Sequence, residues 1–130
     1  MSRFLKVMPR LPVTDLQRAN TFYRDLLGFT VDSLWPADKP CFALLERDHV
    51  CVQFYVADAT KGEAVGHGTL SFELDDVLTL HTNLEGRVNI EWGPEVYWYG
   101  RREFAIKDTS GYLIIFSEAT TDPPTCQDES

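Results

Sequence analysis

The sequence predicts an α+β protein made of two βαβββ modules that form curved mixed sheets around a cleft, and three observations predict it. A strand, an Asp, an amphipathic helix and three strands follow one another twice along the 130 residues. The apolar fraction of 44% is ordinary for a chain with a core. Each module alone exposes an apolar sheet face, so we expect the two faces to pair and leave a cleft. A generic α+β domain whose halves only look alike is the alternative.

The first module begins with a short strand expected over residues 7–14, which Pro9 and Pro12 restrict to a sheet edge or a broken ladder. Asp15 follows as a typical helix N-cap. Apolar residues then recur at helical spacing until Gly28, where the helix is expected to end. The remaining strands of this module are expected over residues 29–32, 41–45 and 50–56.

The second module repeats this order after a polar, Gly-containing connector at residues 57–68. Asp75 and Asp76 are candidate N-caps, and a weaker helical stripe follows them. Residues 93–100 are expected to be a loop rich in aromatic side chains, because Gly and Pro interrupt the strand pattern there. The strands of this module are expected over residues 69–74, 88–92, 102–107 and 112–117.

These boundaries predict one domain over residues 1–118 and a mobile acidic tail over residues 119–130, which are polar and contain proline. Within the domain, module one covers residues 6–56 and module two covers residues 69–118.

The net charge of −8 argues against nucleic-acid binding, which needs a basic surface. It favours a cationic ligand if the carboxylates line a cleft, although solubility alone also explains it. The chain contains no run of about 18 apolar residues, so we expect no membrane span. The N-terminus lacks the apolar stretch of a secretory signal, so we expect no such signal. Three cysteines at no metal-like spacing indicate reduced thiols, so we expect a cytoplasmic protein.

Three stretches of the chain resemble signatures of the glyoxalase/bleomycin-resistance/dioxygenase superfamily, also called the vicinal oxygen chelate superfamily. They are residues 11–29, 72–77 and 100–116, in the expected order. The resemblance implies the fold described above and an intertwined homodimer. It does not select a function, because this superfamily hosts lyases, dioxygenases, epimerases and proteins that only bind ligands.

The resemblance also implies where the superfamily's metal ligands would lie, usually His, Glu or Gln. In this chain those positions are Met8, Gln53, Thr69 and Ile115. Only Gln53 is a plausible donor, and one neutral amide does not hold a divalent ion. His67 lies two residues before Thr69, but a loop position beside glycines is the simpler interpretation. We therefore expect no metal cofactor.

The chain is most similar in type to the bleomycin-resistance proteins, which implies a non-enzymatic dimer that sequesters a cationic aromatic antibiotic in clefts at the dimer interface. Pro9 lies where such proteins exchange an N-terminal arm, and an aromatic loop lines their groove. Ser71 stands where they carry a stacking aromatic residue, so this pocket would be more polar. The residues expected to contact ligand are Asp32, Trp35, Phe42, Gln53, Trp92, Tyr97, Trp98, Tyr99 and Arg102.

Two other functions stay open at this point. One is a metal-dependent lyase or dioxygenase of the same superfamily that uses a displaced metal site. The other is a protein-interaction module with a closed cleft.

Overall fold

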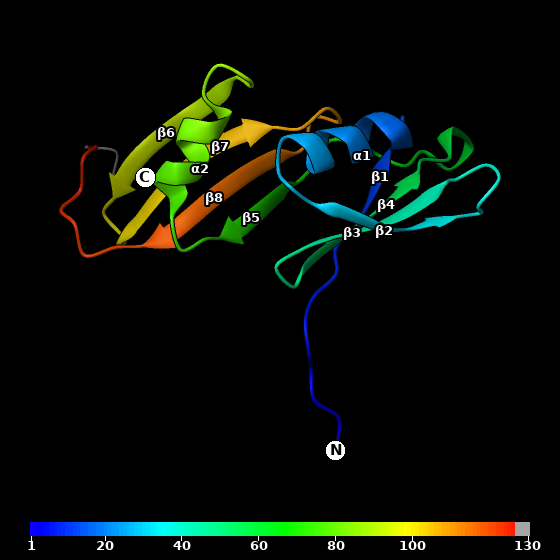
Figure 1. Ribbon diagram of the computed structural model, residues 1–130, viewed down its shortest axis with the longest axis horizontal. Helices are drawn as coiled ribbons and strands as arrows, with labels where there is room; N and C mark the ends of the chain where they lie inside the picture. Colours follow the sequence, from blue (N-terminus) through cyan, green and yellow to red (C-terminus); the bar gives the residue numbers. More distant parts are fainter. Residues whose placement is uncertain (127–130) are drawn as a thin grey trace. The chain divides into compact units, whose positions relative to one another are not determined.

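A computed structural model describes residues 1–126 and divides the chain into two compact units at residues 66 and 67. Each unit contains one four-stranded mixed sheet and one α-helix (Figure 1). The predicted order of strand, helix and three strands is confirmed in both units, and with it the α+β class. Neither α-helix is long and apolar enough to cross a membrane in the described part of the chain.

Unit 1 has the strand order β1-β4-β3-β2, with β1 parallel to β4 and the other pairs antiparallel. Strand β1 is shorter than predicted, because residues 7–9 lie outside it. Pro9 has no N–H to donate, and its carbonyl accepts only the first bond of the ladder, from Gln53 N at 2.8 Å. The elements are β1 (Arg10–Val13), α1 (Leu16–Asp25), β2 (Thr30–Trp35), β3 (Phe42–Arg47), β4 (Val50–Val56) and a short 3₁₀ turn at Ala59–Lys61.

Helix α1 forms where the sequence predicts it. The Asp15 carboxylate accepts from Arg18 N at 3.0 Å, which satisfies one of the N–H groups left open in the first turn. The apolar stripe of the helix is buried against the sheet, and the Tyr23 ring meets Phe54 of β4 edge-on at 4.9 Å. Gly28 adopts a left-handed φ of 74° just beyond the helix and lets the chain turn back into β2.

Unit 2 has the equivalent order β5-β8-β7-β6, with β5 parallel to β8. Strand β6 continues to Tyr97, so the prediction of a loop from residue 93 is wrong for residues 93–97. Irregular register around Gly93 and Pro94 absorbs the two strand-breaking residues, and pairing with β7 resumes beyond them. The elements are β5 (Thr69–Glu73), α2 (Val77–Leu84), β6 (Ile90–Tyr97), β7 (Arg101–Lys107) and β8 (Leu113–Ala119).

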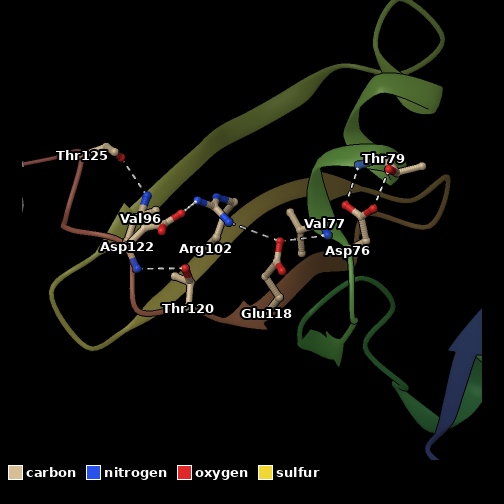
Figure 2. A network of polar contacts seen from close by, with 9 residues as sticks. All are labelled: Asp76, Val77, Thr79, Val96, Arg102, Glu118, Thr120, Asp122 and Thr125. Carbon is tan, nitrogen blue, oxygen red and sulfur yellow. Dashed lines mark hydrogen bonds and ion pairs between the residues drawn. The ribbon is translucent and has the colours of Figure 1, made fainter.

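Helix α2 covers one face of the second sheet. Asp76 caps it by accepting from Thr79 N at 3.1 Å and from the Thr79 hydroxyl at 2.7 Å (Figure 2). The His81 ring meets Phe104 of β7 at 5.1 Å, so this histidine packs against the sheet. The core under the helix contains Val77, Leu84, Phe104, Ile106, Ile114 and Phe116, all buried.

The segment after β8 lies along the edge strand β6. Thr125 N donates to Val96 O at 2.9 Å, and the Thr125 hydroxyl accepts from Val96 N at 2.8 Å. Asp122 pairs with Arg102 of β7 (Figure 2). Residues 127–130 lie outside the described residues, so the mobility predicted for the whole 119–130 tail stays a prediction.

Candidate functional site

The face of each sheet that is not covered by its helix is the natural place for a ligand. Side chains alternate between the two faces of a strand, so the residues under the helix identify those on the other side. In unit 1, Val52 and Phe54 are buried on the α1 side. In unit 2, Phe104 lies on the α2 side. We call the opposite surfaces the helix-free face of unit 1 and the helix-free face of unit 2.

Three of the predicted ligand contacts meet on the helix-free face of unit 1. Trp35 lies opposite Phe42 in the β2–β3 register, and Leu44 lies opposite Gln53 in the β3–β4 register. Because Phe42 and Leu44 are two residues apart, their side chains share a face. Trp35 is 69% exposed, whereas Phe42 and Gln53 are half-buried. The structure therefore brings Trp35, Phe42 and Gln53 together on neighbouring strands.

Asp32 has a different position from these three. It lies where the β2–β3 register shifts between Val31 and Ser33. Its side chain is exposed and lines a hollow of about 390 Å³ that Gly28 and Arg47 also line. Asp32 therefore lies toward the N-terminal end of β2, whereas Trp35 is the last residue of that strand.

The predicted aromatic residues of unit 2 form one continuous series of ring contacts, which we call the aromatic series. Trp92 meets Tyr97 edge-on at 5.9 Å. Tyr97 stacks on Tyr99 at 5.7 Å with only 8° between the ring planes. Trp98 meets Tyr99 edge-on at 5.4 Å, and both are substantially exposed, at 62% and 46%. The pairing of Trp92 with Ala105 and of Tyr97 with Arg101 assigns the first two rings to the helix-free face.

A buried carboxylate lies beside the aromatic series. Glu103 is only 8% exposed, and its carboxylate accepts a hydrogen bond from the Tyr99 hydroxyl. Burial of that hydroxyl and the neighbouring carboxylate raise the pKa of Tyr99 above its ordinary value. Glu95 lies opposite Glu103 in the β6–β7 register and accepts from the Thr125 hydroxyl. Two carboxylates therefore adjoin the aromatic rings on the helix-free face.

Arg102 lies on the α2 side of the sheet. Its guanidinium is 3.6 Å from the Glu118 carboxylate and pairs with Asp122, while Glu118 accepts from Val77 N at 3.1 Å at the start of α2 (Figure 2). Its neighbour Arg101 takes the position expected for Arg102. Arg101 Nε donates to the Ser117 hydroxyl at 2.5 Å, and its Nη2 is 3.1 Å from the Glu73 carboxylate.

Sequence reasoning missed Arg101 because two adjacent arginines look alike in a linear pattern. Counting back along β7 from Phe104 would have identified Arg101. Successive side chains alternate between the two faces, so Arg101 and Glu103 share the face opposite Phe104.

The net charge of the protein is confined to unit 2. Residues 1–66 carry eight basic and eight acidic side chains, whereas residues 67–130 carry four basic and twelve acidic ones. An acidic surface raises the local concentration of cations. The aromatic series therefore lies in the half of the chain that attracts a positively charged ligand.

The positions implied for a metal do not fit one in either unit. In unit 1 the Gln53 oxygen accepts from Arg10 Nε at 2.8 Å, and the Gln53 nitrogen is 4.0 Å from the Met8 sulfur. Gln53 has the only amide oxygen among the four implied ligand positions, and the positive charge of Arg10 beside it repels a metal cation. In unit 2, Thr69 and Ile115 lie on the paired strands β5 and β8 and offer a hydroxyl and a hydrocarbon. Among residues 1–126, no three His, Cys, Asp or Glu side chains are grouped as a metal site would need.

Several solved structures share this fold. An antibiotic-binding protein from Streptomyces sp. CB03234 has a TM-score of 0.76 and 21% identity, over 92% of this chain and 99% of the other. A bleomycin-binding protein from Streptomyces verticillus, solved with copper(II)-bleomycin, has a TM-score of 0.70 and 22% identity, over 94% and 100%. A lactoylglutathione lyase from Agrobacterium tumefaciens has a TM-score of 0.70 and 22% identity, over 87% and 92%. At these identities the likeness shows the fold alone.

No curated protein sequence matches this chain. The sequence model of one family, however, matches residues 3–116, which is most of the chain. With two βαβββ units and the solved relatives above, this match identifies the family. The chain belongs to the Glyoxalase/Bleomycin resistance protein/Dioxygenase superfamily.

Proposed function

We propose that this protein binds a small cationic aromatic molecule without transforming it, and that the helix-free face of unit 2 holds the aromatic and cationic part. The observation that carries the proposal is the aromatic series beside the buried carboxylate of Glu103. Flat rings stack on such a series, and a cation gains from both the ring faces and the carboxylates. The concentration of the whole net charge in unit 2 supports the same ligand class.

The solved relatives support this choice of ligand. Two of the similar structures are described as an antibiotic-binding protein and a bleomycin-binding protein. We propose sequestration of a bleomycin-like antibiotic as the corresponding role, in the cytoplasm, where the cysteines would remain reduced. In this proposal Arg101 replaces Arg102 as the arginine near the ligand. The proposed contacts on the helix-free face of unit 2 are Trp92, Tyr97, Trp98, Tyr99 and Arg101. Trp35, Phe42 and Gln53 are proposed as contacts on the helix-free face of unit 1, considered by itself.

The proposal includes a homodimer in which the N-terminal arm lies on a second copy of the chain. The arm extends away from its own unit (Figure 1), and its apolar residues Phe4, Leu5 and Val7 are 101%, 81% and 78% exposed. A second copy that covers them removes this apolar surface from water. Size-exclusion chromatography tests the dimer, and elution as a 14.8 kDa monomer would contradict it.

The binding test is a tryptophan fluorescence titration with bleomycin. We expect quenching with a dissociation constant below about 1 µM, because ring stacking and charge pairing act together. No quenching at about 50 µM ligand would refute the proposal.

A matched pair of variants locates the cationic contact. Glu95→Gln removes a carboxylate that lies opposite Glu103, and we expect several-fold weaker binding. Glu91→Gln removes the same charge from an exposed position on the same strand, and we expect unchanged affinity. Equal effects of the two substitutions would show that only overall charge matters.

A metal-dependent lyase is the second candidate function, because a similar fold occurs in a lactoylglutathione lyase. The four implied ligand positions do not favour this function, because they offer a thioether, an amide, a hydroxyl and a hydrocarbon, which do not form a set of ligands for a divalent metal. Metal analysis of the purified native protein distinguishes the two: stoichiometric nickel, zinc, iron or manganese would contradict the binding-only proposal.

A further inference from the structure

Arg10 is held in a fixed position on the helix-free face of unit 1 by two neutral groups. Its Nε donates to the Gln53 oxygen at 2.8 Å, and its guanidinium carbon lies 5.3 Å from the centre of the Phe42 ring. The register explains both contacts. Arg10 lies opposite Gln53 in the β1–β4 pair, and Phe42 of β3 lies opposite Tyr55, two residues after Gln53 on the same face of β4. Hydrogen bonding and ring stacking orient the guanidinium without neutralising its charge.

Four of the other seven arginines of the chain are paired with acids. Arg24, Arg47, Arg101 and Arg102 each have a carboxylate oxygen within 4.0 Å. Arg10 has no such carboxylate among residues 1–126. A guanidinium carries five N–H donors in a planar fork, and Gln53 uses one of them. The remaining donors and the unneutralised charge suit an incoming oxyanion, which arginine binds in a two-pronged manner.

The surroundings of Arg10 combine aromatic surface with a second cation. Trp35 lies opposite Phe42 and is 69% exposed. Lys6 Nζ is 3.4 Å from the Cys51 sulfur, two residues before Gln53 on the same strand. Glu46 lies opposite Cys51 in the β3–β4 register, and Glu63 already accepts from the Tyr55 hydroxyl and from Asp58 N. Around Arg10 itself this face is therefore cationic and aromatic, in contrast with unit 2.

We propose that the helix-free face of unit 1 binds an aromatic ring that bears an anionic oxygen, such as a carboxylate or phenolate, and that Arg10 determines this specificity. The inference rests on the proposed function and deepens it by naming the ligand chemistry that the helix-free face of unit 1 recognises. Phe42 and Trp35 offer the ring surface, and the outward N–H groups of Arg10 receive the oxyanion. Gln53 acts as a positioning residue that holds the guanidinium by its Nε.

The test compares two probes with the same ring, naphthoate and the neutral naphthamide, by isothermal titration calorimetry on the full chain. We expect naphthoate to bind about tenfold more tightly, which is the lower range for a charge-assisted hydrogen bond at an exposed site. Arg10→Met keeps an apolar stem over Phe42 and should remove this preference, so that naphthoate binds no more tightly than naphthamide. Arg18→Met removes one charge from an exposed helix position in the same unit and should preserve the preference.

Four outcomes would overturn the inference. These are no naphthoate binding up to about 1 mM, equal affinities for the two probes, an unchanged preference in Arg10→Met, and loss of naphthoate binding in EDTA, which would assign the oxyanion to a metal. Bleomycin quenching is measured separately. If quenching persists without naphthoate preference, only this inference fails, whereas naphthoate preference without quenching refutes the cationic-ligand proposal alone.

Discussion

Gly93→Ala is expected to destabilise unit 2 strongly, because an added methyl group has no room between β6 and β7. A Cβ at this position would lie 2.3 Å from the Glu103 carbonyl oxygen and 2.8 Å from Phe104 Cα. Both are backbone atoms of the central strand β7, so neither can move aside like the end of a flexible side chain. Gly93 also has a φ of 78°, which costs a residue with a Cβ about 1–2 kcal/mol. Overpacking adds about 1–3 kcal/mol, so we expect a loss of about 2–5 kcal/mol.

Gly86→Ala is the matched control for this substitution. Gly86 lies in the same unit with a φ of 82°, but a Cβ there meets nothing within 4 Å. It should therefore show only the backbone cost of about 1–2 kcal/mol. Urea unfolding followed by tryptophan fluorescence measures both free energies of unfolding. If Gly93→Ala costs no more than Gly86→Ala, the close approach of β6 to β7 does not limit this position.

Three further predictions concern polar contacts of unit 2. Hydrogen bonds from Thr79 lower the pKa of Asp76 below its ordinary value of 3.8, so the carboxylate's stabilisation should be present above that pH and disappear as pH falls through the folded-state pKa. Urea unfolding of Asp76→Asn against the wild type should show a stability difference that vanishes in acid, and a difference independent of pH would contradict this. Tyr99→Phe removes the hydroxyl that donates to the buried Glu103 carboxylate and should lower the free energy of unfolding by about 1–3 kcal/mol. Adding Glu103→Gln to the same chain should recover part of this loss. Strictly additive losses of the two substitutions in thermal unfolding would contradict the pairing. Asp122→Asn removes an acidic partner of Arg102, and hydrogen exchange should become faster at the amide of Thr125; an unchanged rate would show that the ion pair does not hold this segment.

The helix starts were predictable from sequence because capping is local. Asp15 and Asp76 each accept from the N–H three residues later, as an Asp before an amphipathic run should. The extension of β6 through residues 93–97 was not predictable in the same way. Gly93 and Pro94 break a strand pattern locally, and only pairing with β7 reveals that the strand resumes after an irregularity.

The aromatic contacts were also partly predictable. Tyr97, Trp98 and Tyr99 are adjacent in sequence, and their density marked a candidate binding surface. The two arginines are adjacent in sequence, so the sequence does not reveal which of them shares a face with the aromatic rings. That choice depends on which face of β7 packs against α2. The structure places Arg101 beside Ser117 and Glu73, and Arg102 beside Glu118 and Asp122.

The sequence by itself determined the two βαβββ modules, the helix caps and the acidic balance of the second half. All of these follow from residue type and from periodicity over a few neighbouring residues. Only the tertiary structure decided that Arg10 lies over Phe42 and against Gln53, because β1 reaches its partner strand across more than forty residues of chain. Contacts of that kind depend on strand order and register, which the local pattern does not contain.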